Sequence, residues 1–546
     1  LDASESVAKV AGASISRTLS DHFSDEINVK DFGAVGDGAT DDTVSMNLAF
    51  TAARTLLQTK SVKIVIPAGR YKLGPSWNPA ISAQNDMAIV GGGAGTTTLV
   101  FNGTDGFDIS GNLKNLVVEG MGLLTAYTGS QYAFTGLSIM GPSSGKQFIS
   151  PKLDNLTFAD SLNDSANRQY AWATSINLVT TANADIRGVR VEMPDLTWSN
   201  TTSGVALHIN GQGNDNGSGP FNTDTSISGL FAVGGYAAIT VGPYVQGVYV
   251  VNSASVGQAY GITWDGTKSD DAPMLLTAMN NEFSDHYAGI QTKSVTMLHM
   301  IGNQITHYAE NSAGEFIGID IEGGGYGSIV GNDILGKSIS TVYPEDGIVV
   351  NNNGGAPIGI SANSVTLISG WGAWLKGTTT SAAVSSLTVN GSSKATAIKD
   401  DIGKNSVAGT AFNGIQSSMF DDGTYVSFRR NILFPAPNVS NSAYIGSDGI
   451  GGIQVSNNLR SSGNIFSIGG YLYLSNDPTG TSVYKDPYGG GVGASGYVTA
   501  PYFIGTLATP SSSSANCRTG QFMDDANYHY VCVATNTWKR VALSTF

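Results

Sequence analysis

A repeat in the middle of the chain limits the fold more than any other feature of the sequence. Four hexapeptides share an initial Gly-Ile and begin at positions 261, 289, 318 and 347: GITWDG, GIQTKS, GIDIEG and GIVVNN. Their isoleucines are 28, 29 and 29 positions apart. Five asparagines follow β-rich runs in the same region: Asn252, Asn281, Asn303, Asn332 and Asn363. Fixed periods of about 20 to 50 residues are typical of solenoids and propellers.

The repeat fits one coil of a parallel β-helix better than a propeller blade, which needs four strands in about 40 to 45 residues. In a β-helix, equivalent residues of successive coils stack about 4.8 Å apart. Stacked isoleucines would then form a core ladder, and an asparagine at a turn could bond the next one. Most of the remaining chain consists of short apolar or alternating runs separated by Gly, Asn, Ser and Thr. We therefore expect an all-β solenoid.

One amphipathic helix is predicted near the start of this region, over residues 41–58. Asp41 and Asp42 stand at its first turn, where carboxylates stabilise free N–H groups and the helix dipole. Its buried stripe is predicted from apolar residues four positions apart: Val44, Leu48, Ala52 and Leu56. Because the ends of a solenoid must be covered, we expect this helix to cap the β-helix.

Composition excludes several classes of partner. The chain has 28 Lys and Arg against 42 Asp and Glu, a formal charge of −14, so binding to nucleic acid is not expected. No stretch reaches the roughly 18 consecutive apolar residues of a membrane span, and residues 1–25 lack the pattern of a signal peptide. Two cysteines, Cys517 and Cys532, cannot form a disulfide framework; they could pair with each other across a hairpin or stay free, and free thiols are the default expectation. No metal motif stands out, and no cofactor is expected.

Four segments are predicted from changes in composition. Residues 1–26 are a polar lead-in, and a start at Leu1 rather than Met suggests that something N-terminal is missing. Residues 27–380 would form the β-helix. Residues 381–508 contain Ser/Thr-rich and then Gly-rich short strands. The linker TPSSSSA then leads into a small β module within residues 509–546, with a hairpin turn at DDANYHY.

Two parts of the sequence resemble known proteins. INVKDFGAVGDGATDDT, the predicted helix and VKIVIPAGRYKLG follow one another as at the entry to the pectate-lyase-like, right-handed parallel β-helix superfamily, over residues 27–100. That superfamily includes polygalacturonases and the tailspikes of bacteriophages. The closing DANYHYVCVATNTWKRVAL resembles C-terminal modules of phage tail fibres and tailspikes. Together, these segments make the phage tailspikes the best single match.

The resemblance implies more than the composition does. It implies a homotrimer of the phage virion that binds, and commonly cuts, capsular, O-antigen or exopolysaccharide at the host cell surface. It also implies an N-terminal domain that attaches the spike to the phage tail or baseplate and that is absent here. Residues 381–508 would serve trimerisation or carbohydrate binding. No insertion into a membrane is expected.

Strand alternation places two acidic residues on one outward face. If the isoleucine of each hexapeptide points into the core, the third and fifth residues point outward. These outward residues are Thr263, Gln291, Asp320 and Val349, and Asp265, Lys293, Glu322 and Asn351. Asp320 and Glu322 then share one strand, with Cα atoms about 6.6 Å apart.

Such a pair suits glycoside hydrolysis. The reaction needs one protonated and one ionised carboxyl group at roughly 5 to 9.5 Å, and repulsion between adjacent carboxylates would keep one of them protonated. We therefore predict Asp320 and Glu322 as the catalytic pair, with Asp265, Glu310 and Glu315 as further candidates.

Candidate substrate-binding residues lie near the same strands. Loops beside the repeats carry acids, histidines and an aromatic residue: Glu282, Asp285, His286, His307 and Tyr308. Lys293 stands between Asp265 and Glu322 in adjacent repeats. Aromatic residues that could stack on sugar rings are Trp264, Trp371, Trp374, Tyr308 and Tyr326. Trp264 would point inward, however, where its side chain is large for a coil, so that its rung could be out of register.

Other functions stay open at the level of sequence. Asp265, Lys293 and Glu322 could form a structural ladder of ion pairs instead of a site. A polysaccharide lyase would eliminate across a uronate with a base such as Lys293, His286 or His307. A receptor-binding fibre would retain the polymer without shortening it. The resemblance favours a functional site over a structural ladder, and hydrolysis is the leading hypothesis.

Overall fold

The computed structural model describes most of the chain up to residue 413 and the C-terminal end. The described residues are 6–9, 11–23, 26–142, 149–160, 170–194, 203–212, 220–266, 274–308, 315–337, 344–352, 357–377, 380–390, 396–401, 406–408, 411–413, 446–447, 453–454, 472–473, 482–485, 492–494 and 507–545. The chain divides into two compact units. One comprises Leu1–Phe434 and Ala443–Ser456, and the other comprises Pro435–Ser442 and Asn457–Phe546.

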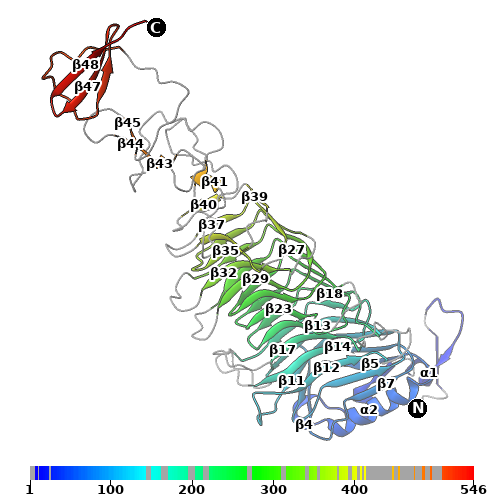
Figure 1. The fold of residues 1–546 in the computed structure, drawn as a ribbon. Coiled ribbons are helices and arrows are strands. Elements are labelled where there is room, and N and C mark those ends of the chain that lie inside the picture. Colours follow the sequence, from blue (N-terminus) through cyan, green and yellow to red (C-terminus); the bar gives the residue numbers. More distant parts are fainter. Residues whose placement is uncertain are drawn as a thin grey trace. The chain divides into compact units, whose positions relative to one another are not determined.

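The first unit is built from three columns of parallel strands (Figure 1). The first column is a twelve-stranded sheet, in which each strand pairs with the equivalent strand of the next coil. Its members are β7 (Ala80–Ala83), β10 (Phe107–Gly111), β12 (Tyr132–Met140), β14 (Ala171–Val179), β17 (Val205–Asn210), β20 (Ala237–Val241), β23 (Tyr260–Asp265), β26 (Ala288–Lys293), β29 (Phe316–Glu322), β32 (Glu345–Asn351), β35 (Trp371–Leu375) and β38 (Thr396–Asp400).

The other two columns meet in β11 (Asn115–Thr125) and β13 (Ser150–Asp160), which are long enough to pair in both. One column continues through β3 (Glu26–Asn28), β5 (Val62–Ile66), β8 (Met87–Gly91), β15 (Asp185–Arg187), β18 (Thr225–Ser228), β21 (Gly247–Val251), β24 (Leu275–Met279), β27 (Met297–Ile301), β30 (Tyr326–Val330), β33 (Ile358–Ser361), β36 (Ala382–Ser385) and β39 (Ser406–Ala408).

The third column comprises β4 (Asp37–Asp41), β6 (Gly69–Leu73), β9 (Thr97–Phe101), β16 (Arg190–Glu192), β19 (Phe231–Val233), β22 (Ala254–Val256), β25 (Glu282–Asp285), β28 (Gln304–His307), β31 (Asp333–Leu335), β34 (Ser364–Thr366), β37 (Thr388–Asn390) and β40 (Ala411–Asn413). The predicted parallel β-helix is confirmed. Parallel pairing runs to β39 and β40, about 30 residues beyond the boundary expected near residue 380.

Equivalent residues of the four hexapeptides pair with one another in the twelve-stranded sheet. Ile262, Ile290, Ile319 and Ile348 pair in consecutive coils and are fully buried. Trp264 keeps this register, pairing with Thr292, and its side chain is also fully buried. The coil at this position has room for an inward-facing indole. The size of the Trp264 side chain therefore does not shift its strand out of register.

A ladder of buried asparagines runs along one corner of the coils. Each donates from its backbone and from Nδ2 to Oδ1 of the next, at 2.8–3.1 Å, through Asn281, Asn303, Asn332 and Asn363. The side chains also donate from Nδ2 to backbone carbonyls of the preceding coil, as Asn303 does to Ala278. Asn252 was expected to belong to this series but lies outside it, exposed and at a φ of 49°. The following residue, Ser253, donates its backbone N–H to Asn281 instead.

Steric crowding explains why each repeated hexapeptide begins with glycine. A Cβ atom at Gly318 would lie 2.5 Å from the side chain of Ile334 and 2.7 Å from the carbonyl oxygen of Gly347. Two columns therefore approach each other at this corner too closely for any side chain.

The predicted capping helix is α2 (Thr43–Leu56). The predicted stripe was wrong, because Val44 and Leu48 are 70% and 55% exposed. The buried face instead carries Met46, Ala49, Phe50 and Ala53. Phe50 packs against the rings of Trp77 and Phe107, with centroids 5.2 and 5.6 Å away, so the helix covers aromatic residues of the first coils.

Short elements precede this cap. They are β1 (Val7–Ala8), β2 (Arg17–Thr18), α1 (Leu19–Phe23) and the 3-10 helix η1 (Val29–Phe32). Among the described residues, no helix is both long enough and apolar enough to cross a membrane.

The C-terminal unit contains an antiparallel sheet of β46 (Phe522–Asp524), β47 (Tyr528–Ala534) and β48 (Thr537–Ala542). The hairpin turn expected at DDANYHY joins the first two of these strands. Cys517 and Cys532 form a disulfide, so the expectation of free thiols was wrong. The bridge packs with Tyr530 and Trp538 in a small core of its own.

Most of the predicted segment 381–508 beyond residue 413 lies outside the described residues. The described pieces are short antiparallel pairings of β41 (Gly446–Ser447) with β42 (Ile453–Gln454), and of β44 (Ser482–Lys485) with β43 (Leu472–Tyr473) and β45 (Val492–Ala494).

Candidate active site

A pocket of about 260 Å³ opens on the outer face of the twelve-stranded sheet, over β23, β26, β29, β32 and β35. Carboxylates, tyrosines, one tryptophan and one lysine line it. The lining residues are Tyr260, Tyr287, Ala288, Gln291, Glu315, Ile317, Asp320, Glu322, Val349, Trp374 and Lys376. They come from five successive coils, so the parallel register alone brings them together.

Two rows of outward-facing side chains run across these strands, and both contribute residues to the pocket. The third residues of the hexapeptides form one row that ends on β35: Thr263, Gln291, Asp320, Val349 and Trp374. The fifth residues form the second row: Asp265, Lys293, Glu322 and Asn351. Asp320 and Glu322 both line the pocket, as neighbours on β29.

Asp320 is only 4% exposed although it lies on an outer face. Its pKa is raised to about 6, chiefly by burial and further by the charges of Glu322 and Glu315. The Gln291 amide, which donates from Nε2 to Asp320 Oδ2 at 3.1 Å, and the charge of Lys376 lower this pKa. Asp320 can therefore hold a proton in mildly acidic solution and release it near neutrality.

Two more carboxyl groups lie behind this aspartate. Asp346 on β32 is buried, and its Oδ1 accepts the backbone N–H of Trp371 at 2.5 Å. Burial raises the pKa of Asp346 well above its usual range, and the adjacent Glu315 carboxyl raises it further. Glu315 lines the pocket and Asp346 does not, so Glu315 connects the buried acid to the pocket.

The C-terminal side of the pocket is aromatic and basic. Lys376 lies 5.0 Å and Lys399 4.4 Å from the ring centroid of Trp374. Trp374 Nε1 donates to Asp401 at 3.1 Å, and Lys399 also lies 5.2 Å from the Trp371 ring. The lysines therefore occupy indole faces, and Lys376 brings a positive charge to the acidic pocket.

The structure gathers some of the predicted site residues and separates others. Asp320, Glu322 and Glu315 line one pocket. Lys293 and Asp265 lie on the same face in the second row, one and two coils from Glu322. In the part of the chain that the structure describes, Lys293 and Glu322 form no ion pair, so this link of the alternative structural ladder is missing. Glu310 lies outside the described residues.

Five predicted substrate-binding residues lie on other faces or in the core. Trp264 is fully buried, which contradicts stacking on a sugar ring. His286 is 6% exposed and packs edge-on against Tyr308, whose exposed ring does not line the pocket. Glu282 on β25 and Tyr326 on β30 belong to the other columns of strands.

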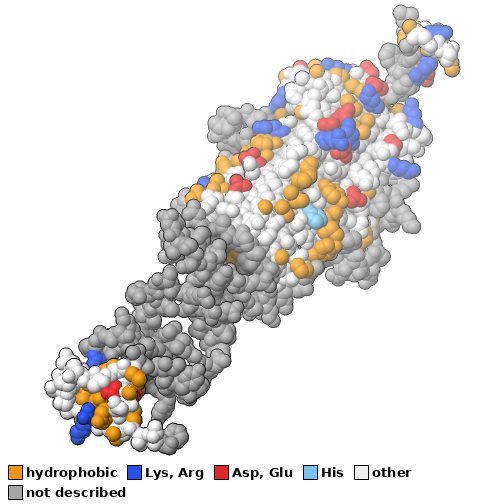
Figure 2. All heavy atoms as spheres, turned by 90° about the horizontal axis from the view of Figure 1, so that it is seen from above, with side chains coloured by type: hydrophobic (Ala, Val, Ile, Leu, Met, Phe, Trp, Pro, Cys, Tyr) orange, Lys and Arg blue, Asp and Glu red, His pale blue; other side chains and the backbone are white. Residues whose placement is uncertain are grey.

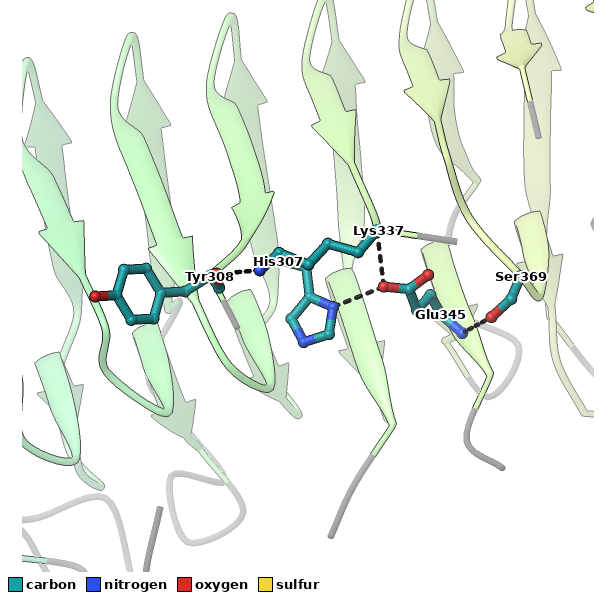
Figure 3. A network of polar contacts seen from close by, with 5 residues as sticks. All are labelled: His307, Tyr308, Lys337, Glu345 and Ser369. Atoms are coloured by element: carbon teal, nitrogen blue, oxygen red, sulfur yellow. Dashed lines mark hydrogen bonds and ion pairs between the residues drawn. The ribbon is translucent and has the colours of Figure 1, made fainter. Parts of the chain in front are cut away.

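His307 belongs to a buried polar network (Figure 3). Its Nδ1 lies 2.6 Å from Glu345 Oε1, and its ring stacks on Phe316 with centroids 4.7 Å apart. Glu345 Oε1 also accepts the backbone N–H of Lys337 at 2.8 Å, and the backbone N–H of Glu345 donates to Ser369 Oγ at 3.0 Å. These contacts join three successive turns, and they hold the His307 side chain away from the pocket lining.

A second buried acid lies beside this network. Asp285 accepts hydrogen bonds from Ser255 Oγ at 2.6 Å and from the backbone N–H of Gln258 at 3.3 Å. Burial raises the pKa of Asp285 to about 8, while the two hydrogen bonds lower it. Asp285 is fully buried and does not reach the pocket.

Sequence reasoning assigned no role to several residues that line the pocket. Gln291 was placed on the correct face, and its bond to Asp320 follows from that register. Trp374 was named as an aromatic candidate, whereas Trp371, which was assigned to substrate binding, lies outside the pocket lining. Tyr260, Tyr287 and Lys376 were missed. The tyrosines start or precede strands one and two coils before Asp320, which is a signal that the alignment of the repeats contains.

Charged side chains of both signs are interspersed on one face of the protein (Figure 2). On the face shown in Figure 2, Lys and Arg side chains stand beside Asp and Glu instead of forming one basic patch. Among the described residues, no three His, Cys, Asp or Glu side chains are placed to hold a metal ion.

No family model matches the sequence. Depolymerase 1 of Klebsiella phage K5-2, which is capsule-specific, is 39% identical over 82 residues, or 15% of this chain and 10% of the relative. Mannuronan C5-epimerase AlgE3 of Azotobacter vinelandii is 29% identical over 132 residues, or 24% of this chain and 6% of the relative. The protein is a parallel β-helix related to both.

The matched segments cover a tenth or less of each of these relatives. Among solved structures, a mutant tailspike protein of Escherichia coli bacteriophage HK620, in complex with a pentasaccharide, is 13% identical to this β-helix protein. The match covers 77% of this chain and 84% of the tailspike, with a TM-score of 0.45. The expected resemblance to phage proteins is confirmed by the sequence similarity to the phage depolymerase.

Proposed function

We propose that this protein is a tailspike depolymerase, which binds a bacterial surface polysaccharide and hydrolyses its glycosidic bonds. The observation that carries the proposal is Asp320, a buried carboxylic acid with a pKa near 6, beside a second carboxylate in an open pocket. The sequence similarity to a capsule-specific phage depolymerase supports the same chemistry. In this proposal the protein acts as a homotrimer on the virion, at the surface of the host.

The two carboxyl groups have separate roles. Asp320 gives its proton to the glycosidic oxygen as the bond between that oxygen and the anomeric carbon breaks. Glu322 takes the proton of the water that attacks the anomeric carbon, or attacks this carbon itself before water releases the sugar. Burial favours the protonated form that a general acid needs, which assigns the acid to Asp320 rather than to the half-buried Glu322.

A second candidate is elimination in a polymer that contains uronate, which the similarity to a mannuronan C5-epimerase favours. Two observations favour hydrolysis over elimination. The pocket lining carries three carboxylates against one lysine, which opposes an anionic substrate. Two of the bases expected for elimination, His286 and His307, are buried away from the pocket.

The test is digestion of purified capsular and O-antigen polysaccharides from a panel of bacterial strains. We expect reducing ends to appear while ultraviolet absorbance stays constant. Asp320→Asn and Glu322→Gln should each lower kcat by about 100-fold or more. Asp108→Asn is the matched control, because Asp108 is a partly buried aspartate in the same row, seven strands away.

Three results would contradict the proposal. A rise in absorbance from an unsaturated uronate would identify elimination. Binding of polymers without any loss of polymer length would identify a receptor-binding fibre. Full activity of both variants would place the chemistry elsewhere on the protein.

A further inference from the structure

Three tyrosines form a ladder along the edge of the pocket. Tyr236 precedes β20, Tyr260 begins β23 and Tyr287 precedes β26. Tyr260 pairs with Ala237 and Ala288, so the three tyrosines lie within one residue of the same register position at the start of successive strands. Their ring centroids are 5.4 and 5.8 Å apart. The backbone N–H of Tyr260 donates to the carbonyl of Tyr236 at 3.1 Å, which fixes one rung on the next. The ladder therefore runs parallel to the axis of the β-helix, with nearly the spacing of the strands.

The ladder leads out of the pocket in one direction. Tyr260 and Tyr287 line the pocket beside Asp320, and Tyr236 lies one coil further towards the N-terminus. All three residues are partly exposed. Burial raises the pKa of Tyr260 to about 12 and raises that of Tyr236, so both phenols stay neutral and can donate hydrogen bonds.

A polar row accompanies the tyrosines on the same face. Thr240, Thr263 and Gln291 occupy consecutive coils in the row that leads to Asp320 from the N-terminal side. Thr240 Oγ1 lies 2.7 Å from Nδ1 of His208, and Thr263 Oγ1 donates to Gln291 Oε1 at 3.5 Å. Aromatic rings along a strip of hydroxyl and amide groups match a sugar chain, which has apolar ring faces and hydroxyl edges.

The opposite side of the pocket is less suited to such stacking. Lys376 and Lys399 lie over the Trp374 ring, and Trp374 Nε1 is bonded to Asp401. Among the described residues, no Lys or Arg lies over the ring of Tyr236 or Tyr260. The rings of Tyr236 and Tyr260 thus offer aromatic surface that no cation of the described chain covers.

We propose that the tyrosine ladder of Tyr236, Tyr260 and Tyr287 holds consecutive sugar residues of the polysaccharide. These sugars lie on the side of the cleaved bond that faces the N-terminal end of the β-helix. The inference rests on the proposed function, and it adds the path of the substrate. The polymer runs along the β-helix axis, with one sugar packed near each tyrosine and hydroxyl groups bonded to the polar row. Tyr236 is the outermost described member of this series, so it contacts long substrates and not the sugar at the cleavage point.

The first test measures binding, in the Asp320→Asn background, of a polysaccharide that the wild-type protein cleaves. Adding Tyr236→Ala should weaken binding by about tenfold, whereas Tyr236→Phe, which keeps the ring, should bind within about twofold of the parent. Tyr236→Leu fills much of the volume without an aromatic ring and should resemble Tyr236→Ala. The matched control is Tyr249→Ala on β21, because this partly exposed tyrosine belongs to another column of strands.

The second test separates binding from chemistry in the active protein. Tyr236→Ala should raise KM for the polymer with kcat unchanged, and should leave kcat/KM for the shortest cleaved oligosaccharide unchanged. Unaltered polymer binding in both Tyr236→Ala and Tyr236→Leu, or no polymer binding by the parent, would overturn the ladder. If Asp320→Asn stays hydrolytic while these effects persist, the catalytic assignment fails and the ladder stands.

Discussion

Asp320 points outward from the solenoid, yet its side chain has almost no contact with water. Neighbouring coils supply the cause, because the side chains of Gln291, Glu322 and Lys376 surround its carboxyl group in the pocket. An isolated strand would leave the same aspartate solvated and ionised. The property that suits this residue to acid catalysis therefore comes from stacking of coils, not from its own strand.

The pH dependence of hydrolysis follows from this environment. Since the general acid must be protonated, kcat/KM should fall as the pH rises above about 6. Gln291→Leu removes a hydrogen bond that stabilises the ionised form, so it should raise the pKa of Asp320 and move this limb of the profile to higher pH. The measurement is kcat/KM from pH about 4 to 9 for both proteins.

Gln304→Leu provides the control for this experiment, because Gln304 is an exposed glutamine on β28, in another column. A limb that stays in place in Gln291→Leu, or moves to lower pH, would contradict the role of the amide.

Sequence reasoning reached the catalytic candidates through alternation alone. A strand that buries Ile319 and Ile321 has to present Asp320 and Glu322 on the opposite face. The same rule predicted that Trp264 would face the core. It could not find Lys376, because the segment WGAWLKG lacks the hexapeptide signature and its register becomes clear only from the pairing of β32 with β35. It also misjudged His286 and His307, since a residue in a tight corner turn can point inward as well as outward.

Among the elements, the asparagine ladder is the clearest case of a side chain that builds the fold. Its members satisfy buried backbone groups that the corner turns leave without a strand partner. Of the five asparagines predicted from sequence spacing, four belong to the ladder. It missed that the series ends at Asn281, where Ser253 takes the preceding position, because the period alone does not distinguish adjacent residues.

Removing one rung should be costly. Asn303→Ala deletes an acceptor for two N–H groups of Asn281 and two donors of its own, all of them buried. The free energy of unfolding should fall by about 2 to 4 kcal/mol, because each unpaired buried group keeps its desolvation cost. Denaturation of the β-helix, followed by circular dichroism, measures this loss.

Asn252→Gly is the matched control, since Asn252 is exposed and glycine accepts its positive φ. Its stability should change by a few tenths of a kcal/mol. Equal losses in the two variants would show that the ladder contributes nothing specific.

The capping helix shows what periodicity leaves undecided. Two stripes of α2 are apolar, one with Val44 and Leu48 and one with Met46 and Phe50. The second is buried because Phe50 meets Trp77 and Phe107, which lie about 30 and 60 residues away in the sequence. The existence of the helix could be predicted from local residues, but the face that it buries depends on these distant partners.

On the scale of the whole molecule, the two units are stabilised in different ways. The β-helix has a continuous apolar core, whereas the described core of the C-terminal unit comprises Cys517, Tyr530, Cys532 and Trp538. So small a core relies on its disulfide. From the sequence, the two cysteines could pair across the hairpin or stay free; the default expectation of free thiols was wrong because the fold of this module brings them together.

Removal of the disulfide should therefore affect one unit only. The double variant Cys517→Ala and Cys532→Ala should lose about 3 kcal/mol in the C-terminal unit, because the bridge closes a loop of 15 positions. In calorimetry of the intact chain, the transition of that unit should move to lower temperature, while the β-helix transition stays in place.

Reductant added to the double variant is the control and should have no further effect. A shift of both transitions, or of neither, would contradict independent stabilisation of the two units.

The asparagine ladder also bears on how such a chain can change in length. Each asparagine accepts hydrogen bonds from the asparagine before it and donates the same kind of bond to the one after it. The two ends of a coil therefore carry complementary hydrogen-bonding groups. Duplication of one coil between Asn303 and Asn332 would leave every amide with a partner and would lengthen the sheet by one strand. Evolution can therefore extend or shorten this surface in whole coils, and each step adds or removes one position along the path of a bound polymer.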